Sequence, residues 1–148
     1  MWSGSLLRHW LTQVGLNTNR TDGYALEAPV SLGPYVPSMP NRIAVATFTP
    51  GAGLTNEGVL DRPGFQLRVR GWQGEAARGD DYTHRMAMQF DRDILFADFP
   101  TTVTAPDGDS AYLLRVTRAG GGPAPLGNAD QGGRLEFVCT YLAHVSTD

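Results

Sequence analysis

The residues of this chain best suited to chemistry are its histidines, its single cysteine and a run of three glycines. Asp80, Asp81 and His84 carry metal-ligand atoms at close spacing, but a metal site needs a third or fourth ligand from elsewhere. No HExxH, paired CxxC or DxDxDG pattern supplies one. We therefore expect no metal site, and we expect Asp80 or Asp81 to cap a helix instead.

A nucleophile and a phosphate-binding loop are the other reactive possibilities. Cys139 lies within an alternating apolar pattern, which predicts a buried thiol and not an exposed nucleophile with a lowered pKa. Gly120, Gly121 and Gly122 precede a Pro-Ala-Pro run, whereas a phosphate loop leads into a helix through Gly-Lys-Ser or Gly-Lys-Thr. No serine lies in a Gly-x-Ser-x-Gly elbow. The sequence predicts no catalytic residues, no cofactor and no enzyme activity.

Arg68, Arg70 and Trp72 form the remaining group with binding chemistry. The two arginines alternate with apolar residues that face the other way, namely Phe65, Leu67 and Val69. This alternation predicts a half-buried strand with a polar outer face. The group suits a nucleic acid backbone, acids on a neighbouring subunit, or a solvated strand face. The net charge of −3 lacks the basic footprint of a duplex-DNA binder.

Length and composition restrict the class of protein. The 148 residues suit one domain over 1–148, and 41% hydrophobic with 18% charged residues is typical of a globular chain. All 12 basic residues are arginine, which suggests GC-rich coding, and a single cysteine fits a reducing compartment. The N-terminus lacks the pattern of a signal peptide or membrane span, so we expect a soluble protein made in a cytoplasm.

Periodicity and turn residues predict an alternation of helices and strands. Helices are expected at about 5–14 and 81–96, with Met86, Phe90 and Ile94 on the apolar stripe of the second. A Pro-rich loop is expected at about 17–41. Strands are expected at about 42–48, 65–72, 101–104, 112–118 and 134–144. This order predicts an α+β fold, in which a mainly antiparallel sheet of about five strands packs against an N-terminal helix and a central helix.

Two stretches resemble a known family of phage proteins. The first, Gly58 to Gly71, combines an Asp-Arg-Pro-Gly turn with alternating arginines and follows a glycine-rich turn at Pro50 to Gly53. The second runs from Gly122 to Phe137. Together they resemble the minor capsid or tail terminator proteins of long-tailed phages with actinobacterial hosts, over about residues 42–142. The Pro-rich stretch 29–40 is longer than the resemblance leads us to expect between the first helix and the first strand.

The resemblance implies a structural protein of the virion with a tail terminator-like fold. Tail terminators form a ring, usually of six subunits, that caps the tail tube at its final length and then joins it to the head connector or stopper protein. DNA passes through the lumen without sequence-specific binding, and no membrane takes part. Assembly takes place in the host cytoplasm. Such a ring needs a heterologous interface that closes on itself.

Two other functions stay open: a head-closure or stopper protein of the same phage neck, and a small host enzyme or ligand-binding domain. For a ring, contacts with a neighbouring subunit or with the tail tube are expected at Arg68, Arg70, Trp72, Gly120, Gly121 and Leu126. The glycines and prolines of 119–133 predict a loop without regular structure. We expect this loop or the loop at 49–63 to lie at such a contact.

Overall fold

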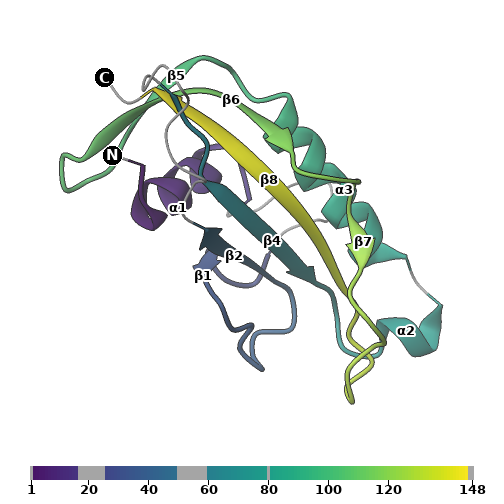
Figure 1. The fold of residues 1–148 in the computed structure, drawn as a ribbon. Helices are drawn as coiled ribbons and strands as arrows, with labels where there is room; N and C mark the ends of the chain where they lie inside the picture. The colour runs from purple at the N-terminus through teal and green to yellow at the C-terminus, as the bar shows by residue number, and fades with distance from the viewer. Residues whose placement is uncertain (1, 17–25, 50–59, 80, 147–148) are drawn as a thin grey trace.

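The computed structural model describes residues 2–16, 26–49, 60–79 and 81–146 (Figure 1). The helices are α1 (Gly4–Gln13), α2 (Glu75–Arg78) and α3 (Tyr82–Leu95). The strands are β1 (Ser31–Leu32), β2 (Ile43–Thr49), β3 (Leu60–Asp61), β4 (Gly64–Arg70), β5 (Thr101–Thr104), β6 (Ser110–Arg118), β7 (Ala124–Pro125) and β8 (Glu136–Ser146). The predicted α+β class is confirmed, with both expected helices and all five expected strands in the expected order.

The eight strands of the described residues belong to one curled sheet in the order β1-β2-β4-β8-β6-β5, with β3 and β7 paired to β8 outside this path (Figure 1). Every pairing is antiparallel except that of β1 with β2. The predicted number of about five strands is therefore too low, and the sheet is mixed. The three additional strands, β1, β3 and β7, have two residues each, which is too short to leave a periodic signal in the sequence.

The short strand β7 corrects the expectation that 119–133 holds no regular structure. β6 pairs with β8 as far as Arg118 opposite Tyr141, and beyond that point β7 takes over the same edge of β8. Ala124 lies opposite Val138 in this pairing. The backbone groups of a strand need partners, so a chain that runs along a free edge pairs with it even when its side chains favour a loop.

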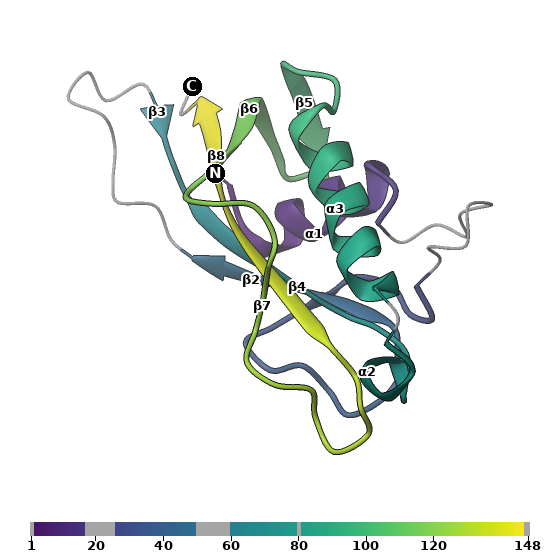
Figure 2. The same ribbon diagram turned by 90° about the vertical axis from the view of Figure 1, so that its right-hand side faces the viewer.

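Helices α1 and α3 lie on the same side of the sheet (Figure 2). α3 packs against β4, β6 and β8, and α1 packs against β1, β2 and β5. As predicted, Met86, Phe90 and Ile94 are buried, and so are Phe65, Leu67 and Val69 of β4. These side chains belong to one hydrophobic cluster that fills the space between helices and sheet. No helix among the described residues has the length and hydropathy needed to span a membrane.

The cap of α3 differs from the prediction. Asp80 lies outside the described residues, and the side chain of Asp81 forms an ion pair with Arg85 (3.0 Å) and no capping bond. Buried Glu75 caps the helix instead. Its carboxylate accepts a hydrogen bond of 2.6 Å from the backbone N–H of Thr83 and another from the Thr83 hydroxyl. A carboxylate from α2 thus satisfies the first turn of α3.

Candidate functional site

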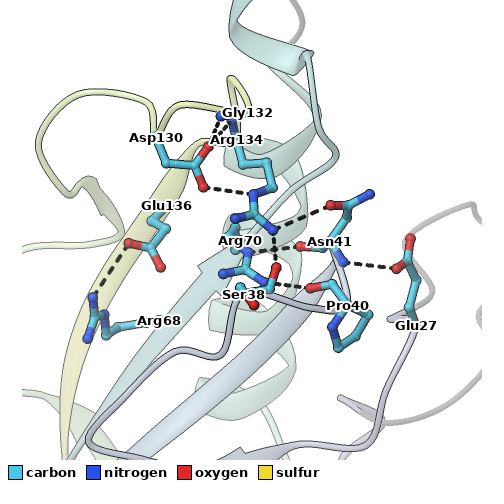
Figure 3. Close-up of polar contacts among 10 residues, drawn as sticks. All are labelled: Glu27, Ser38, Pro40, Asn41, Arg68, Arg70, Asp130, Gly132, Arg134 and Glu136. Atoms are coloured by element: carbon cyan, nitrogen blue, oxygen red, sulfur yellow. Dashed lines mark hydrogen bonds and ion pairs between the residues drawn. The ribbon is translucent and has the colours of Figure 1, made fainter.

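The face of the sheet opposite the helices carries Arg68 and Arg70 of β4, and residues 33–41, here called the clamped segment, cross over it (Figure 3). The segment starts very close to β2, because the N–H of Gly33 donates to the carbonyl of Ala46 at 2.7 Å. A Cβ on Gly33 would lie 2.7 Å from the Thr47 hydroxyl. Glycine therefore lets the chain cross the sheet in contact with β2.

Three arginines, here called the arginine clamp, hold the backbone of this segment: Arg68, Arg70 and Arg134. Arg70 donates from Nε to the carbonyl of Asn41 at 3.0 Å and from Nη2 to the carbonyl of Pro40 at 2.5 Å. Arg134 donates to the carbonyl of Ser38. These contacts join segments that lie 29 to 96 residues apart in the sequence.

Arg68 is the most weakly bound member of the clamp. Its Nη1 lies 3.4 Å from the carbonyl of Pro34, and its Nη2 lies 3.5 Å from the carboxylate of Glu136. Its Nε is buried and has no hydrogen-bond partner among the described residues. The side chain of Arg68 remains partly exposed. Arg68 is therefore the clamp member whose hydrogen bonds to the described residues are least complete.

The carboxylate of Asp130 and the burial of Arg70 contribute to the electrostatics of the clamp. Asp130 binds Nε of Arg134 at 2.7 Å and accepts the backbone N–H groups of Gly132 and Arg134 at 2.9 and 3.0 Å. Burial opposes the charged form of Asp130, but the hydrogen bonds from Arg134 and Gly132 outweigh it and lower its pKa. The pKa of Arg70 is lowered by burial and by the positive charge of Arg134. Among the described residues, Arg70 thus donates its hydrogen bonds to neutral carbonyls and not to a carboxylate.

The clamp holds the backbone while the two largest apolar side chains of the segment stay in solvent. Tyr35 is 85% exposed and Met39 is 65% exposed. Pro34, Pro37 and Pro40 further restrict the backbone, because each ring fixes φ. The arrangement therefore presents an aromatic and a thioether side chain on a segment that has already lost much of its conformational freedom.

The predicted contact residues are distributed over separate parts of the molecule. Arg68 and Arg70 point away from the core, as expected, but the expectation of a solvated face is wrong for Arg70, which is only 4% exposed beneath the clamped segment. Trp72 is half-buried and stacks on Tyr82 with ring centroids 4.4 Å apart, while the Arg42 guanidinium lies 4.6 Å from the Trp72 ring. Trp72 therefore belongs to a second cluster at the start of α3.

The other predicted contacts lie in the connection from β6 to β8. Gly120 and Gly121 are exposed, and the carbonyl of Gly121 lies 3.7 Å from Sγ of Cys139. Leu126 is also exposed, and its N–H donates to the carbonyl of Glu136 at 2.9 Å. The loop at 49–63 lies outside the described residues over 50–59. The structure thus brings Arg68 and Arg70 together in the clamp and leaves Gly120, Gly121 and Leu126 in a separate connection.

Sequence reasoning missed a buried polar cluster around Asp91 of α3. Asp91 accepts hydrogen bonds from Nε of Arg118 at 3.1 Å and from the Tyr141 hydroxyl at 2.8 Å, and Sγ of Cys139 lies 3.8 Å away. Burial raises the pKa of Cys139, as expected of an inert thiol. The signal that could have revealed the cluster is an acid directly beside Phe90 on the core side of the helix.

No group of three histidine, cysteine or acidic side chains in the described part of the chain could hold a metal ion. His84, part of the metal pattern weighed from the sequence, stacks on Phe137 with centroids 4.9 Å apart. No model of a known protein family matches the chain, and no curated protein matches it significantly.

Proposed function

We propose that this chain is a structural subunit of a long-tailed phage virion, a tail terminator that caps the tail tube as a ring and joins it to the head connector. The observation that carries the proposal is the presentation of Tyr35 and Met39 by the arginine clamp. Tyrosine and methionine are enriched at the centres of protein interfaces. A segment fixed before binding loses little further entropy when a partner covers it.

The clamp is a costly arrangement for a segment that serves only as a connection. Burial of the Arg70 guanidinium carries a desolvation penalty, and good hydrogen bonds must offset it. A connection between β1 and β2 needs no such support, whereas an assembly surface needs one shape. The clamp therefore favours a protein whose function depends on a fixed surface.

The surroundings of the clamp do not favour a host ligand-binding domain. A depression of about 450 Å³ beside the clamp is lined by Tyr35, Val36, Ser38, Arg68, Arg70, Asp130, Arg134 and Glu136. Ligand pockets are mostly apolar with a few convergent polar groups. Here the charged groups mostly bind one another or the backbone, so they hold the protein together and leave little for a ligand.

In the proposed ring the partners are further copies of this chain, the tail tube protein below and the connector or stopper protein above. DNA would pass through the lumen without being read, in keeping with a net charge of −3. The protein would lie at the neck of the virion after assembly in the host cytoplasm.

Particles assembled without the chain test this function. Without a terminator the tube continues to polymerise, so electron microscopy should show tails of irregular, extended length. A head-closure or stopper role predicts tails of normal length on heads that fail to join or to retain DNA. Antibody label on wild-type virions should lie at the junction of head and tail. Tails of normal length, or label elsewhere, would overturn the proposal.

A matched pair of variants connects this phenotype to the clamped segment. Tyr35→Ser should reproduce the long tails, because it removes the single aromatic side chain of the segment, which is 85% exposed. Tyr112→Ser removes a tyrosine that is 40% exposed on β6, away from the segment, and should assemble normal tails. Equal behaviour of the two variants would remove the clamped segment from the proposed function.

A further inference from the structure

One peptide group of the clamped segment, between Pro40 and Asn41, is held at both of its polar ends (Figure 3). Its carbonyl accepts Nη2 of Arg70 at 2.5 Å, and its N–H donates to Oε2 of Glu27 at 3.1 Å. The carbonyl oxygen is the negative end of the peptide dipole, and the N–H is the positive end. A guanidinium on the first and a carboxylate on the second therefore favour the same orientation of the peptide, through two charge-assisted hydrogen bonds.

Glu27 reaches this peptide from a part of the chain that has supports of its own. The backbone N–H of Glu27 donates to the carbonyl of Arg42 at 3.2 Å, and its Oε1 accepts Nε of Arg42 at 3.3 Å. The Arg42 guanidinium lies over the Trp72 ring and donates to the Tyr82 hydroxyl at 3.3 Å. Contacts outside residues 33–41 thus place the Glu27 carboxylate, so it acts on the clamped segment as a fixed support.

The proline at position 40 makes this peptide decisive for the position of Met39. A residue normally has two soft backbone dihedrals, φ and ψ, and the ring of Pro40 fixes φ. With the Pro40–Asn41 peptide held, ψ of Pro40 is the one soft backbone dihedral between that peptide and the carbonyl carbon of Met39. On the other side of Met39, Arg134 holds the carbonyl of Ser38. The position of Met39, which is 65% exposed, therefore depends directly on the groups that hold this peptide.

We infer that Glu27 is a positioning residue for the proposed assembly surface: it locks the Pro40–Asn41 peptide and so fixes where Met39 projects. The inference rests on the proposed function, to which the clamped segment contributes its exposed side chains. Arg70 holds the same peptide but is itself only 4% exposed, so its removal also disturbs the packing beneath the segment.

Glu27 differs from Arg70 in its exposure. The side chain of Glu27 is 31% exposed, and that of its ion-pair partner Arg42 is 19% exposed. Ion pairs that remain in contact with solvent contribute little to the stability of a fold. The loss of Glu27 should therefore change the order of the clamped segment without a comparable change in global stability.

Two substitutions of Glu27 in the full chain separate positioning from a general loss of stability. Glu27→Ala removes the acceptor, whereas Glu27→Gln keeps a side-chain oxygen for the N–H of Asn41 but loses the charge. The amides of Ser38 and Met39 should exchange at least about fivefold faster in Glu27→Ala than in the wild type, and within about twofold of the wild type in Glu27→Gln. Amides of strand β8 should keep their wild-type rates in both variants.

Asp98→Ala is the matched control, because it removes an exposed acid beyond the end of α3. It should leave the exchange of Ser38 and Met39 unchanged. Assembly is the second readout. Virions with Glu27→Ala should have tails of irregular, extended length, whereas Glu27→Gln and Asp98→Ala should give normal tails.

Unchanged exchange at Ser38 and Met39 in Glu27→Ala would overturn the inference, and so would equal loosening by Asp98→Ala or the absence of rescue by Glu27→Gln. Faster exchange that extends equally to β8 would show a general loss of stability and would also overturn it. If Glu27→Ala gives normal tails while particles lacking the chain have long tails, the inference is wrong and the terminator function stands. If particles lacking the chain have normal tails, the terminator function is wrong, and the exchange rates alone decide whether Glu27 locks the segment.

Discussion

Replacing Arg70 with methionine removes the buried guanidinium of the clamp while keeping most of the side-chain volume. The change leaves the carbonyls of Pro40 and Asn41 without the donors that lie 2.5 and 3.0 Å away. Two hydrogen bonds from a charged donor contribute about 3–6 kcal/mol together. The methionine variant no longer buries a positive charge, and the desolvation of that charge is what lowers the pKa of Arg70. Part of the lost free energy is therefore recovered. We therefore expect the free energy of unfolding to fall by about 2–4 kcal/mol.

Urea unfolding of the isolated chain measures this loss. Arg115→Met is the matched control, since Arg115 is an exposed arginine on strand β6 of the same sheet. Its free energy of unfolding should stay within about 0.5 kcal/mol of the wild type. Arg70→Lys keeps the positive charge but replaces the planar fork with one ammonium group, so its loss should fall between the two.

Hydrogen exchange tests whether the free energy lost in Arg70→Met comes from the clamped segment. In Arg70→Met the amides of Tyr35, Val36, Ser38 and Met39 should exchange faster, because the backbone they belong to has lost its anchor. Amides of the core strand β8 should change only in proportion to the global loss of stability. If Arg70→Met costs no more than Arg115→Met, and the segment exchanges at its original rate, the clamp does not hold the segment and the reasoning fails.

Three further predictions concern the core, the cap of α3 and pH. Leu67→Ala should lower the free energy of unfolding by about 2–5 kcal/mol in urea, because the side chain is fully buried in the core; a loss under about 1 kcal/mol would contradict this packing. Glu75→Gln should lower the melting temperature, because its carboxylate binds the N–H and hydroxyl of Thr83; an unchanged melting curve would exclude that cap. Burial, then the charges of Arg115 and Arg62, lower the pKa of His144, so the folded state binds this proton less readily than the unfolded state. The stability that neutral His144 contributes to the folded state is present above about pH 6.5 and is lost as the pH falls below that value. His144→Gln should therefore flatten the decline in stability between about pH 7 and 5.5, and identical slopes would refute the assignment.

The regular elements were predictable because their signals are local. The alternation of Phe65, Leu67 and Val69 with arginines places those side chains on opposite faces of β4 whatever surrounds the strand. The spacing of Met86, Phe90 and Ile94 likewise defines the buried stripe of α3. Both patterns repeat over several residues, so they indicate the element and its core face without knowledge of the rest of the fold.

The environment of each face depends on segments that come from elsewhere in the chain. The strand pattern places Arg70 opposite the core, but only the path of residues 33–41 shows that this side of the sheet is covered and that Arg70 is buried. Glu75 replaces Asp81 at the start of α3 for the same reason, since α2 folds back against that helix. The pairing of each donor with a carbonyl or carboxylate depends on distance in space, and local sequence patterns do not give that distance.

The candidate site also divides into features that local sequence indicates and features that only tertiary contacts determine. Tyr35 and Met39 lie in a proline-rich stretch whose composition predicts a loop and nothing about exposure. Arg134, which binds Ser38, lies 96 residues further along the chain. Periodicity reports which side of an element a residue occupies, because it depends on neighbours within a few positions. Hydrogen bonds across long separations form only after the sheet has brought the segments together, so tertiary structure alone decides which surface is held rigid and presented.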